Sequence, residues 1–202
     1  MGNLFSVCQA LEHVGARVDL TADPAAVAAA ERLVLPGVGA FPRGMAELAS
    51  RGLIEPIHRV AAAERPLLGI CLGLQLLATR GEEYVDTPGL DLIAGDTIPV
   101  PPEAADGRPH RVPHTGWNAV RPDRHGAWDG TALADVATGS AFYFVHAFHF
   151  VPRDPAHRLA VADYDGRELT AAAGRGSILG CQFHPEKSGP AGLGIFRRFM
   201  AL

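Results

Sequence analysis

Two short apolar segments that lead directly into turns constrain the fold most. Residues 67–70 (LLGI) are fully apolar and run at once into Cys71 and the helical stretch LGLQLLAT. Residues 32–35 (RLVL) end in the same way at the glycine-rich loop PGVGAF, which precedes a predicted helix. Apolar strands that alternate with helices are typical of a mainly parallel sheet with both faces covered. The sequence therefore predicts an α/β fold, and its 202 residues suit a single domain over residues 1–202.

Periodicity and turn residues predict the remaining elements. Helices are expected over residues 4–15, 25–30, 43–50 and 54–63, and from residue 192 to the end. Further strands are expected over residues 17–20, 92–98, 117–120, 141–151, 159–164, 171–173 and 178–183. Residues 86–127 are rich in Pro, Gly, Asp and Arg and are interpreted as mostly loop.

Charge, apolar runs and cysteine usage exclude several classes of protein. The 18 basic and 22 acidic side chains give a formal net charge of −4, so no nucleic-acid partner is expected. No apolar run approaches the roughly 20 residues of a membrane span, and no secretory signal is recognisable. Three widely spaced cysteines are no disulfide framework. We therefore expect a cytoplasmic protein whose thiols are free.

Cys71 lies in the pattern G-x-C-x-G between a predicted strand and a predicted helix, which is the thiol form of a nucleophile elbow. The turn lifts the sulfur clear of the sheet, and the flanking glycines keep the backbone free of side chains. The helix N-terminus favours the thiolate. A small apolar core residue is the competing interpretation. For Cys8, on an apolar helix face, and for Cys181, within a strand, we prefer that interpretation.

A thiol nucleophile needs a nearby imidazole that a carboxylate orients. His184 follows the predicted strand ILGCQF, and Glu186 stands two residues further on. Active-site residues of open α/β sheets collect at such strand ends. Four other histidines are interpreted as exposed helix or loop positions, namely His13, His58, His125 and His157. His110 and His114 are placed in the proline-rich loop. A metal site built from His110, His114, His146 and His149 matches no familiar ligand spacing, so no metal is expected.

These motifs resemble class I, triad-type glutamine amidotransferases. The resemblance rests on GICLGLQ and on FHPE (residues 183–186), and it runs nearly end to end. PGVGAF, PHTGWN (residues 113–118) and FHPEKS are similar to the glutaminase subunits of imidazole glycerol phosphate synthases. The fold implied is an α/β sandwich around a mixed, mostly parallel sheet.

The resemblance implies a role for each matching residue. Cys71 would attack the γ-carboxamide of L-glutamine, His184 would transfer the proton, and Glu186 would orient His184. The remaining roles are an oxyanion hole from the N–H groups of Leu72 and Val38, glutamine binding by Gly39, Gln75 and backbone near His146 and Ala147, and a partner interface at Trp117, Asn118 and Lys187.

The resemblance also implies a partner and no cofactor. The ammonia would pass to a (β/α)₈-barrel cyclase subunit. That subunit would use it to make imidazole glycerol phosphate and an aminoimidazole carboxamide ribotide in histidine biosynthesis. A glutaminase that serves another synthase, such as that for anthranilate or pyridoxal phosphate, is a second hypothesis. A catalytically inert scaffold and a thiol peptidase are further ones.

Two features depart from the family pattern. Ala147 and Phe148 stand where a hydroxyl residue and a tyrosine are more usual. The chain also enters a helix directly, so the first strand of the sheet is expected to be missing. Buried backbone groups left unpaired cost on the order of 1–3 kcal/mol each. We therefore expect that Met1 is an internal methionine rather than the true start.

Overall fold

The computed structural model describes residues 2–202, and Met1, with the expectation about the start, lies outside them. The helices are α1 (Gly2–His13), α2 (Pro24–Ala29), α3 (Phe41–Ser50), α4 (Ile54–Ala62), α5 (Leu72–Leu76) and α6 (Gly189–Ala201), with short 3₁₀ turns at Pro155–His157 and Pro185–Lys187. The strands are β1 (Leu33–Gly37), β2 (Leu67–Cys71), β3 (Arg80–Gly81), β4 (Thr87–Pro88), β5 (Gly95–Pro99), β6 (His114–Pro122), β7 (Ala141–His146), β8 (Phe148–Pro152), β9 (Arg158–Tyr164), β10 (Arg167–Arg175) and β11 (Ile178–Cys181).

The central sheet has seven strands in the order β1-β2-β11-β10-β9-β6-β7. β2 pairs in parallel with β1 and β11, in a register that sets Gly37 beside Cys71 and Cys181 beside Ile70. The carboxyl ends of these three strands therefore meet at one edge, where active-site residues of α/β sheets collect. The turn residues that follow all three strands are thereby brought together.

The other half of the central sheet is antiparallel. The pairs β11–β10, β10–β9, β9–β6 and β6–β7 all run in opposite directions. The α/β fold with a mixed sheet is confirmed, but in the central sheet parallel pairing is confined to β1, β2 and β11. The sheet is thus less parallel than expected, because periodicity reports which face of a strand is buried and says nothing of its direction.

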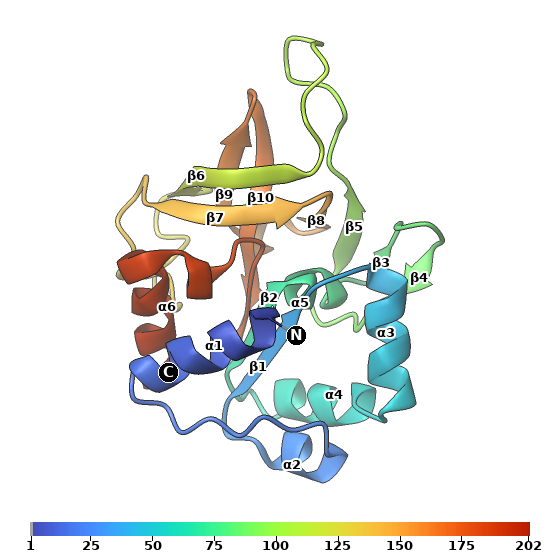
Figure 1. Cartoon of the computed structure of the whole chain (residues 1–202), viewed down its shortest axis with the longest axis vertical. Helices are drawn as coiled ribbons and strands as arrows, with labels where there is room; N and C mark the ends of the chain where they lie inside the picture. Colours follow the sequence, from blue (N-terminus) through green and yellow to red (C-terminus); the bar gives the residue numbers. More distant parts are fainter. Residues whose placement is uncertain (1) are drawn as a thin grey trace.

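A smaller sheet in the order β4-β3-β5-β8 packs beside the central one. Its strand β8 follows β7 after the single residue Ala147, so residues 141–151 form two strands in two sheets (Figure 1). The expectation of one continuous strand was therefore wrong. The junction at Ala147 faces the carboxyl ends of the parallel strands, and both sheets contribute to the cavity found there.

The helices cover the parallel strands on both faces. Figure 1 shows α1 and α6 together on one side of β1 and β2, with α3 and α4 on the other. Leu68 and Ile70 of β2 pack in the core with α1 and α6, whereas Leu67 packs in the core with α3, α4 and α5. This alternation follows from the two-residue period of a strand. β2 is consequently buried throughout.

The first described residues form a helix, as the sequence predicts. α1 ends at His13, and the chain turns away at Gly15, whose φ of 93° lies in the left-handed region that favours glycine. The Ala16 N–H donates to Leu11 O at 3.0 Å. Residues 17–20 form no strand, which contradicts the prediction for that segment. β1 lies at the edge of the sheet, and no strand pairs with its outer side among residues 2–202. Residues 17–20 do not pair with this free edge, so their alternation alone did not identify a strand.

Candidate active site

Cys71 occupies a strained turn between β2 and α5. Its φ of 56° and ψ of −109° are unusual for a residue with a side chain, and such strain is a frequent feature of functional sites. A Cβ on Gly73 would stand 1.8 Å from the Leu35 carbonyl oxygen, and one on Gly69 would stand 2.8 Å from the backbone of Gly73. Both glycines of the G-x-C-x-G pattern are therefore required by close packing, and the strand-turn-helix geometry expected of an elbow is present.

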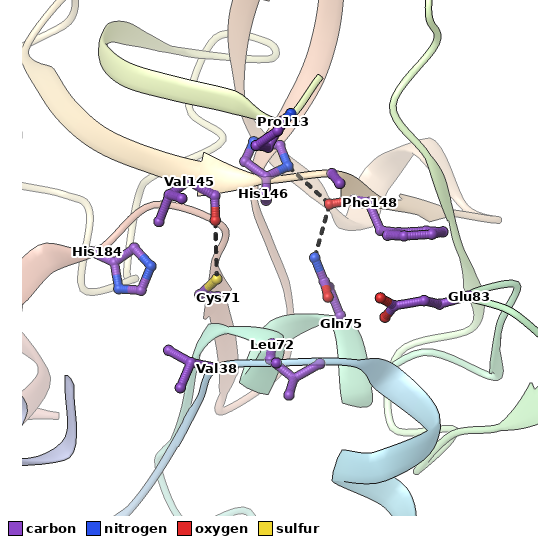
Figure 2. A pocket seen from close by; sticks show the side chains of 12 residues that line it. Val38, Cys71, Leu72, Gln75, Glu83, Pro113, Val145, His146, Phe148 and His184 are labelled. Atoms are coloured by element: carbon purple, nitrogen blue, oxygen red, sulfur yellow. Dashed lines mark hydrogen bonds between the residues drawn. The ribbon is translucent and has the colours of Figure 1, made fainter. Parts of the chain in front are cut away.

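His184 and Glu186 meet just beyond the end of β11. The Nδ1 atom of His184 lies 2.7 Å from Oε1 of Glu186, and the two side chains are 1% and 0% exposed. Since a carboxylate only accepts, Nδ1 carries the donated hydrogen. The other ring nitrogen, Nε2, is buried and has no hydrogen-bond partner in the described part of the chain. Figure 2 shows this ring opposite Cys71.

The electrostatics of His184 favour its protonated form. Burial lowers its pKa, but the neighbouring Cys71 sulfur and the hydrogen bond and charge of Glu186 outweigh burial and raise the pKa to about 9. An imidazolium beside a sulfur stabilises a thiolate. For Cys181, in contrast, burial together with the charge of Glu186 raises the pKa of the thiol far above its ordinary range. Its interpretation as an inert core residue agrees with this environment.

A cavity of about 410 Å³ opens in front of Cys71, within the roughly 300–1,000 Å³ of small-molecule sites. It is lined by Val38, Gly39, Cys71, Leu72, Gln75, Glu83, Pro113, Val145, His146, Ala147, Phe148 and His184 (Figure 2). The structure thus gathers around one cavity every residue that the sequence assigned to catalysis, oxyanion binding or substrate, except Glu186, which lies behind His184.

Glu83 is an acidic lining residue to which the sequence assigned no role. Its Oε2 accepts from the Phe41 N–H at the start of α3, at 2.7 Å. It comes from the loop that follows β3, and nothing in the local pattern EEYVD distinguishes it from a solvated acid. The sequence feature that could have indicated it is its position shortly after the helix that follows Cys71.

Gln75 is held by two hydrogen bonds. Its Nε2 donates to Phe148 O at 2.8 Å and to Gln182 Oε1 at 3.1 Å. Gln182 in turn points its Nε2 at the Cys71 sulfur, 3.8 Å away, and that sulfur lies 3.9 Å from Val145 O. Backbone oxygens therefore hold this wall of the cavity, so the unusual side chains at positions 147 and 148 leave these contacts intact.

His114 lies in a different place from the one expected. It begins strand β6 and is buried, rather than lying in the proline-rich loop. Its Nδ1 is 3.0 Å from Nε2 of His146. Burial lowers the pKa of His114 to about 4, and burial with the neighbouring His114 lowers the pKa of His146 to about 3. Both imidazoles are therefore neutral at neutral pH.

Two of the three residues assigned to a partner interface form one surface group. Trp117 is 60% exposed and packs edge-on against Tyr143, with ring centroids 6.2 Å apart. The Lys187 Nζ lies 5.6 Å from the centre of the same Tyr143 ring, which is 6.4 Å from the His184 ring. Asn118 differs, because its half-buried amide is used inside the protein.

Among residues 2–202 no three His, Cys, Asp or Glu side chains converge in a way that could hold a metal ion. Within the same residues, no helix has the length and apolar character that crossing a bilayer requires.

Comparison with known proteins agrees with this fold and cavity. The family model described as "Glutamine amidotransferase class-I" matches residues 2–201. A crystal structure of a glutamine amidotransferase superposes with a TM-score of 0.72 at 18% identity, covering 100% of this chain and 95% of the other. The glutaminase domain of Trypanosoma brucei CTPS superposes with a TM-score of 0.65 at 18% identity, covering 98% and 88%. The class that fold and cavity define is that of the class I glutamine amidotransferases.

Closer relatives narrow the class. The HisH 1 subunit of imidazole glycerol phosphate synthase from Legionella pneumophila strain Paris is 44% identical over 203 residues, which are 100% of this chain and 95% of that protein. The HisH subunit from Symbiobacterium thermophilum is 49% identical over 193 residues, covering 96% and 86%. The chain belongs to the class I glutamine amidotransferase family and, within it, to the HisH subunits of imidazole glycerol phosphate synthase.

Proposed function

We propose that the chain hydrolyses glutamine to glutamate and ammonia with Cys71 as nucleophile, His184 as acid and base, and Glu186 as the group that orients His184. The observation that carries this proposal is the buried 2.7 Å contact between His184 and Glu186, which leaves Nε2 directed toward the Cys71 side of the cavity. A thiol, an imidazole and a carboxylate in this order are what acyl transfer from an amide requires.

The reaction balances with these three groups alone. The Cys71 thiol proton first passes to Nε2 of neutral His184, which forms the thiolate–imidazolium pair that the raised pKa of His184 favours. The thiolate then attacks the γ-carboxamide carbon. The C–N bond then breaks, the His184 proton goes to the leaving nitrogen, and ammonia and a γ-glutamyl thioester result. Water, deprotonated by His184, attacks the thioester and releases glutamate and the thiol.

The developing oxyanion needs backbone donors. The N–H of Leu72, immediately after the nucleophile, is one, and the N–H of Val38 in the loop after β1 is the other. Val38 is 58% exposed at the mouth of the cavity, and the adjacent Gly39 has a φ of 109°. A glycine in that conformation leaves the loop free to turn a peptide toward the oxyanion when substrate and partner are bound.

The substrate's amino-acid end fits the opposite side of the cavity. Gln75 Oε1 has no protein partner in the described chain, and Glu83 lines the same wall. These two acceptors would bind the α-ammonium group of glutamine. Gly39 and the backbone at His146 and Ala147 complete the binding site, although the carbonyl of Ala147 is already taken by the Val100 N–H at 2.8 Å.

The ammonia would be passed on rather than released. HisH relatives carry the name of a synthase subunit, which implies a second subunit. We propose that this partner is a (β/α)₈-barrel cyclase, that the two form a heterodimer in the cytoplasm, and that it docks over Trp117 and Lys187 beside His184. Ammonia would then enter the cyclase to form imidazole glycerol phosphate and an aminoimidazole carboxamide ribotide.

Glutamate release from glutamine tests the proposal. It is measured for the chain alone, with the cyclase, and with the cyclase and its nucleotide ligand, for the wild type and for Cys71→Ala, with Cys8→Ala as the matched control. We expect partner-dependent release that only Cys71→Ala abolishes. Strong activity of the chain alone would indicate a different glutaminase or hydrolase. A lack of activity in every mixture would indicate an inert scaffold.

A further inference from the structure

A chain of hydrogen bonds leads from strand β6 into the wall of the cavity. Asn118 Nδ2 lies 3.3 Å from His114 Nε2, and His114 Nδ1 lies 3.0 Å from His146 Nε2. His146 Nδ1 lies 2.8 Å from Phe148 O, the oxygen that also holds Gln75. The three side chains therefore join the partner-facing strand β6 to the residues behind the nucleophile.

The direction of every bond in this chain is fixed. A carbonyl oxygen only accepts, so His146 Nδ1 carries the hydrogen, and Nε2 of that neutral ring must accept. His114 Nδ1 is then the donor, which leaves its Nε2 to accept from Asn118. The far end agrees, because the Asn118 amide nitrogen also donates to Asp163 O at 2.5 Å. No tautomer other than Nδ1–H on both rings satisfies all four contacts.

The surroundings hold the two rings in this state. His114 lies between Phe144, with ring centroids 4.7 Å apart, and Tyr164, with centroids 4.1 Å apart. His114 is 3% exposed, and His146 is 5% exposed. Burial among aromatic rings disfavours charge. A second proton on either ring would also place two hydrogen-bond donors face to face, with no acceptor between them.

We propose that Asn118, His114 and His146 are positioning residues that hold the Val145–Phe148 wall of the glutamine cavity through one directed hydrogen-bond chain. The inference rests on the proposed glutaminase function, and it adds three residues that act by positioning the residues that line the cavity. The wall is the point where the chain leaves the central sheet for the smaller one, so no strand ladder fixes Ala147 on both sides. It carries the Val145 oxygen beside Cys71 and the Phe148 oxygen that holds Gln75.

Imidazole tautomers give a readout that does not depend on activity. Nitrogen-15 spectra are recorded for histidine-labelled protein. The signals of the two rings are assigned as those that disappear in His114→Asn and in His146→Asn. We expect both rings to be neutral and protonated at Nδ1 near pH 7. An Nε2–H tautomer or a charged ring at either position would overturn the chain of bonds, whether or not the protein hydrolyses glutamine.

Kinetics of the assembled synthase then test the positioning role. His114→Phe keeps the aromatic packing and removes both bonds, and we expect kcat/KM for glutamine to fall about tenfold, mainly through KM. In His114→Asn the amide nitrogen takes the place of Nδ1, so donation to His146 is retained and activity should recover to within about threefold of the wild type. His110→Phe is the control, since His110 packs on the same Tyr164 ring outside the chain.

Two results would contradict the proposal. One is wild-type kcat/KM in His114→Phe, and the other is an equal loss in His110→Phe. If His114→Phe does not fold, Asn118→Ala removes the first donor at a half-buried site and should raise KM in a protein that still unfolds cooperatively. Failure of the glutaminase function itself would appear as inactivity of the wild type, with the tautomers unaffected.

Discussion

The imidazole of His184 donates to the carboxylate of Glu186 at 2.7 Å, with both side chains almost completely buried. A buried pair of this kind is costly unless the charges compensate each other. Here the imidazolium is compensated on one side by Glu186 and on the other by the sulfur of Cys71. The pair therefore links the protonation of His184 to the stability of the fold as well as to the proposed chemistry.

The stability of the protein should depend on pH through His184. Burial lowers its pKa, but Cys71 and Glu186 raise it to about 9, above the value of 6.5 for a free imidazole. Its contribution is then fully present below about pH 6.5 and is lost as the pH rises through about 9. Urea unfolding gives the free energy of unfolding of the wild type and of His184→Gln. The difference between the two values should decrease as the pH is raised from 6 to 10. A difference that is constant with pH would contradict the raised pKa.

Gly73→Ala should be among the most damaging substitutions in the chain. The new methyl group would stand 1.8 Å from Leu35 O, so β1 or the elbow must move. We expect the free energy of unfolding to fall by about 3 kcal/mol or more. Gly194→Ala is the matched control, because a Cβ there has open space within α6 and should stabilise the helix by roughly 0.5–1 kcal/mol. Equal effects in urea unfolding would show that packing at the elbow is loose.

Glu83→Gln should weaken glutamine binding without affecting the thiol. The amide retains an oxygen for the Phe41 N–H but removes the charge that would face the substrate ammonium. KM for glutamine should rise about tenfold or more, as expected for a hydrogen bond to a charged group. Alkylation of Cys71 by iodoacetamide, which has no ammonium group, should keep its rate. Glu82→Gln, whose carboxylate pairs with Arg80 at 2.9 Å outside the cavity, should leave KM unchanged.

Trp117 should anchor the partner subunit. Exposed aromatic residues are frequent hot spots of interfaces, and truncation of one costs about 2 kcal/mol or more. Trp117→Ala should therefore weaken association with the cyclase about thirtyfold in calorimetric titration. Tyr84→Ala removes an even more exposed aromatic ring, 86% against 60%, from the turn between β3 and β4. A similar loss in both variants would place the interface elsewhere.

Local motifs were enough to single out Cys71, His184 and Glu186, because each motif occupies a short stretch of sequence. The elbow needs only the strand-turn-helix around Cys71, and His184 and Glu186 stand two residues apart. Glu83 and His114 were not assigned because each reaches the site through the folding of a distant segment. Prolines around residue 113 concealed the start of β6, which is why His114 was placed in a loop.

The fold was predicted in its parallel half and less well elsewhere. The parallel strands β1, β2 and β11 are short apolar segments followed by turns. This pattern is typical of buried strands in a parallel sheet. The antiparallel strands carry no sequence mark of their direction. Ala147, which divides residues 141–151 between two sheets, is neither glycine nor proline, so the break has no local signal. The strand expected at residues 17–20 lacks a partner among the described residues, and alternation alone does not make a strand.

The assignment of Cys71 as the nucleophile is tested most directly by finding the residue to which a glutamine analogue becomes attached. The chain, assembled with the cyclase, is incubated with a diazoketone analogue of glutamine, digested, and examined by mass spectrometry. We expect a single adduct on Cys71, whose formation is strongly slowed in His184→Gln and unaffected in Cys8→Ala. An adduct on Cys8 or Cys181, or none on Cys71 while glutamine is being hydrolysed, would contradict the assignment of the nucleophile.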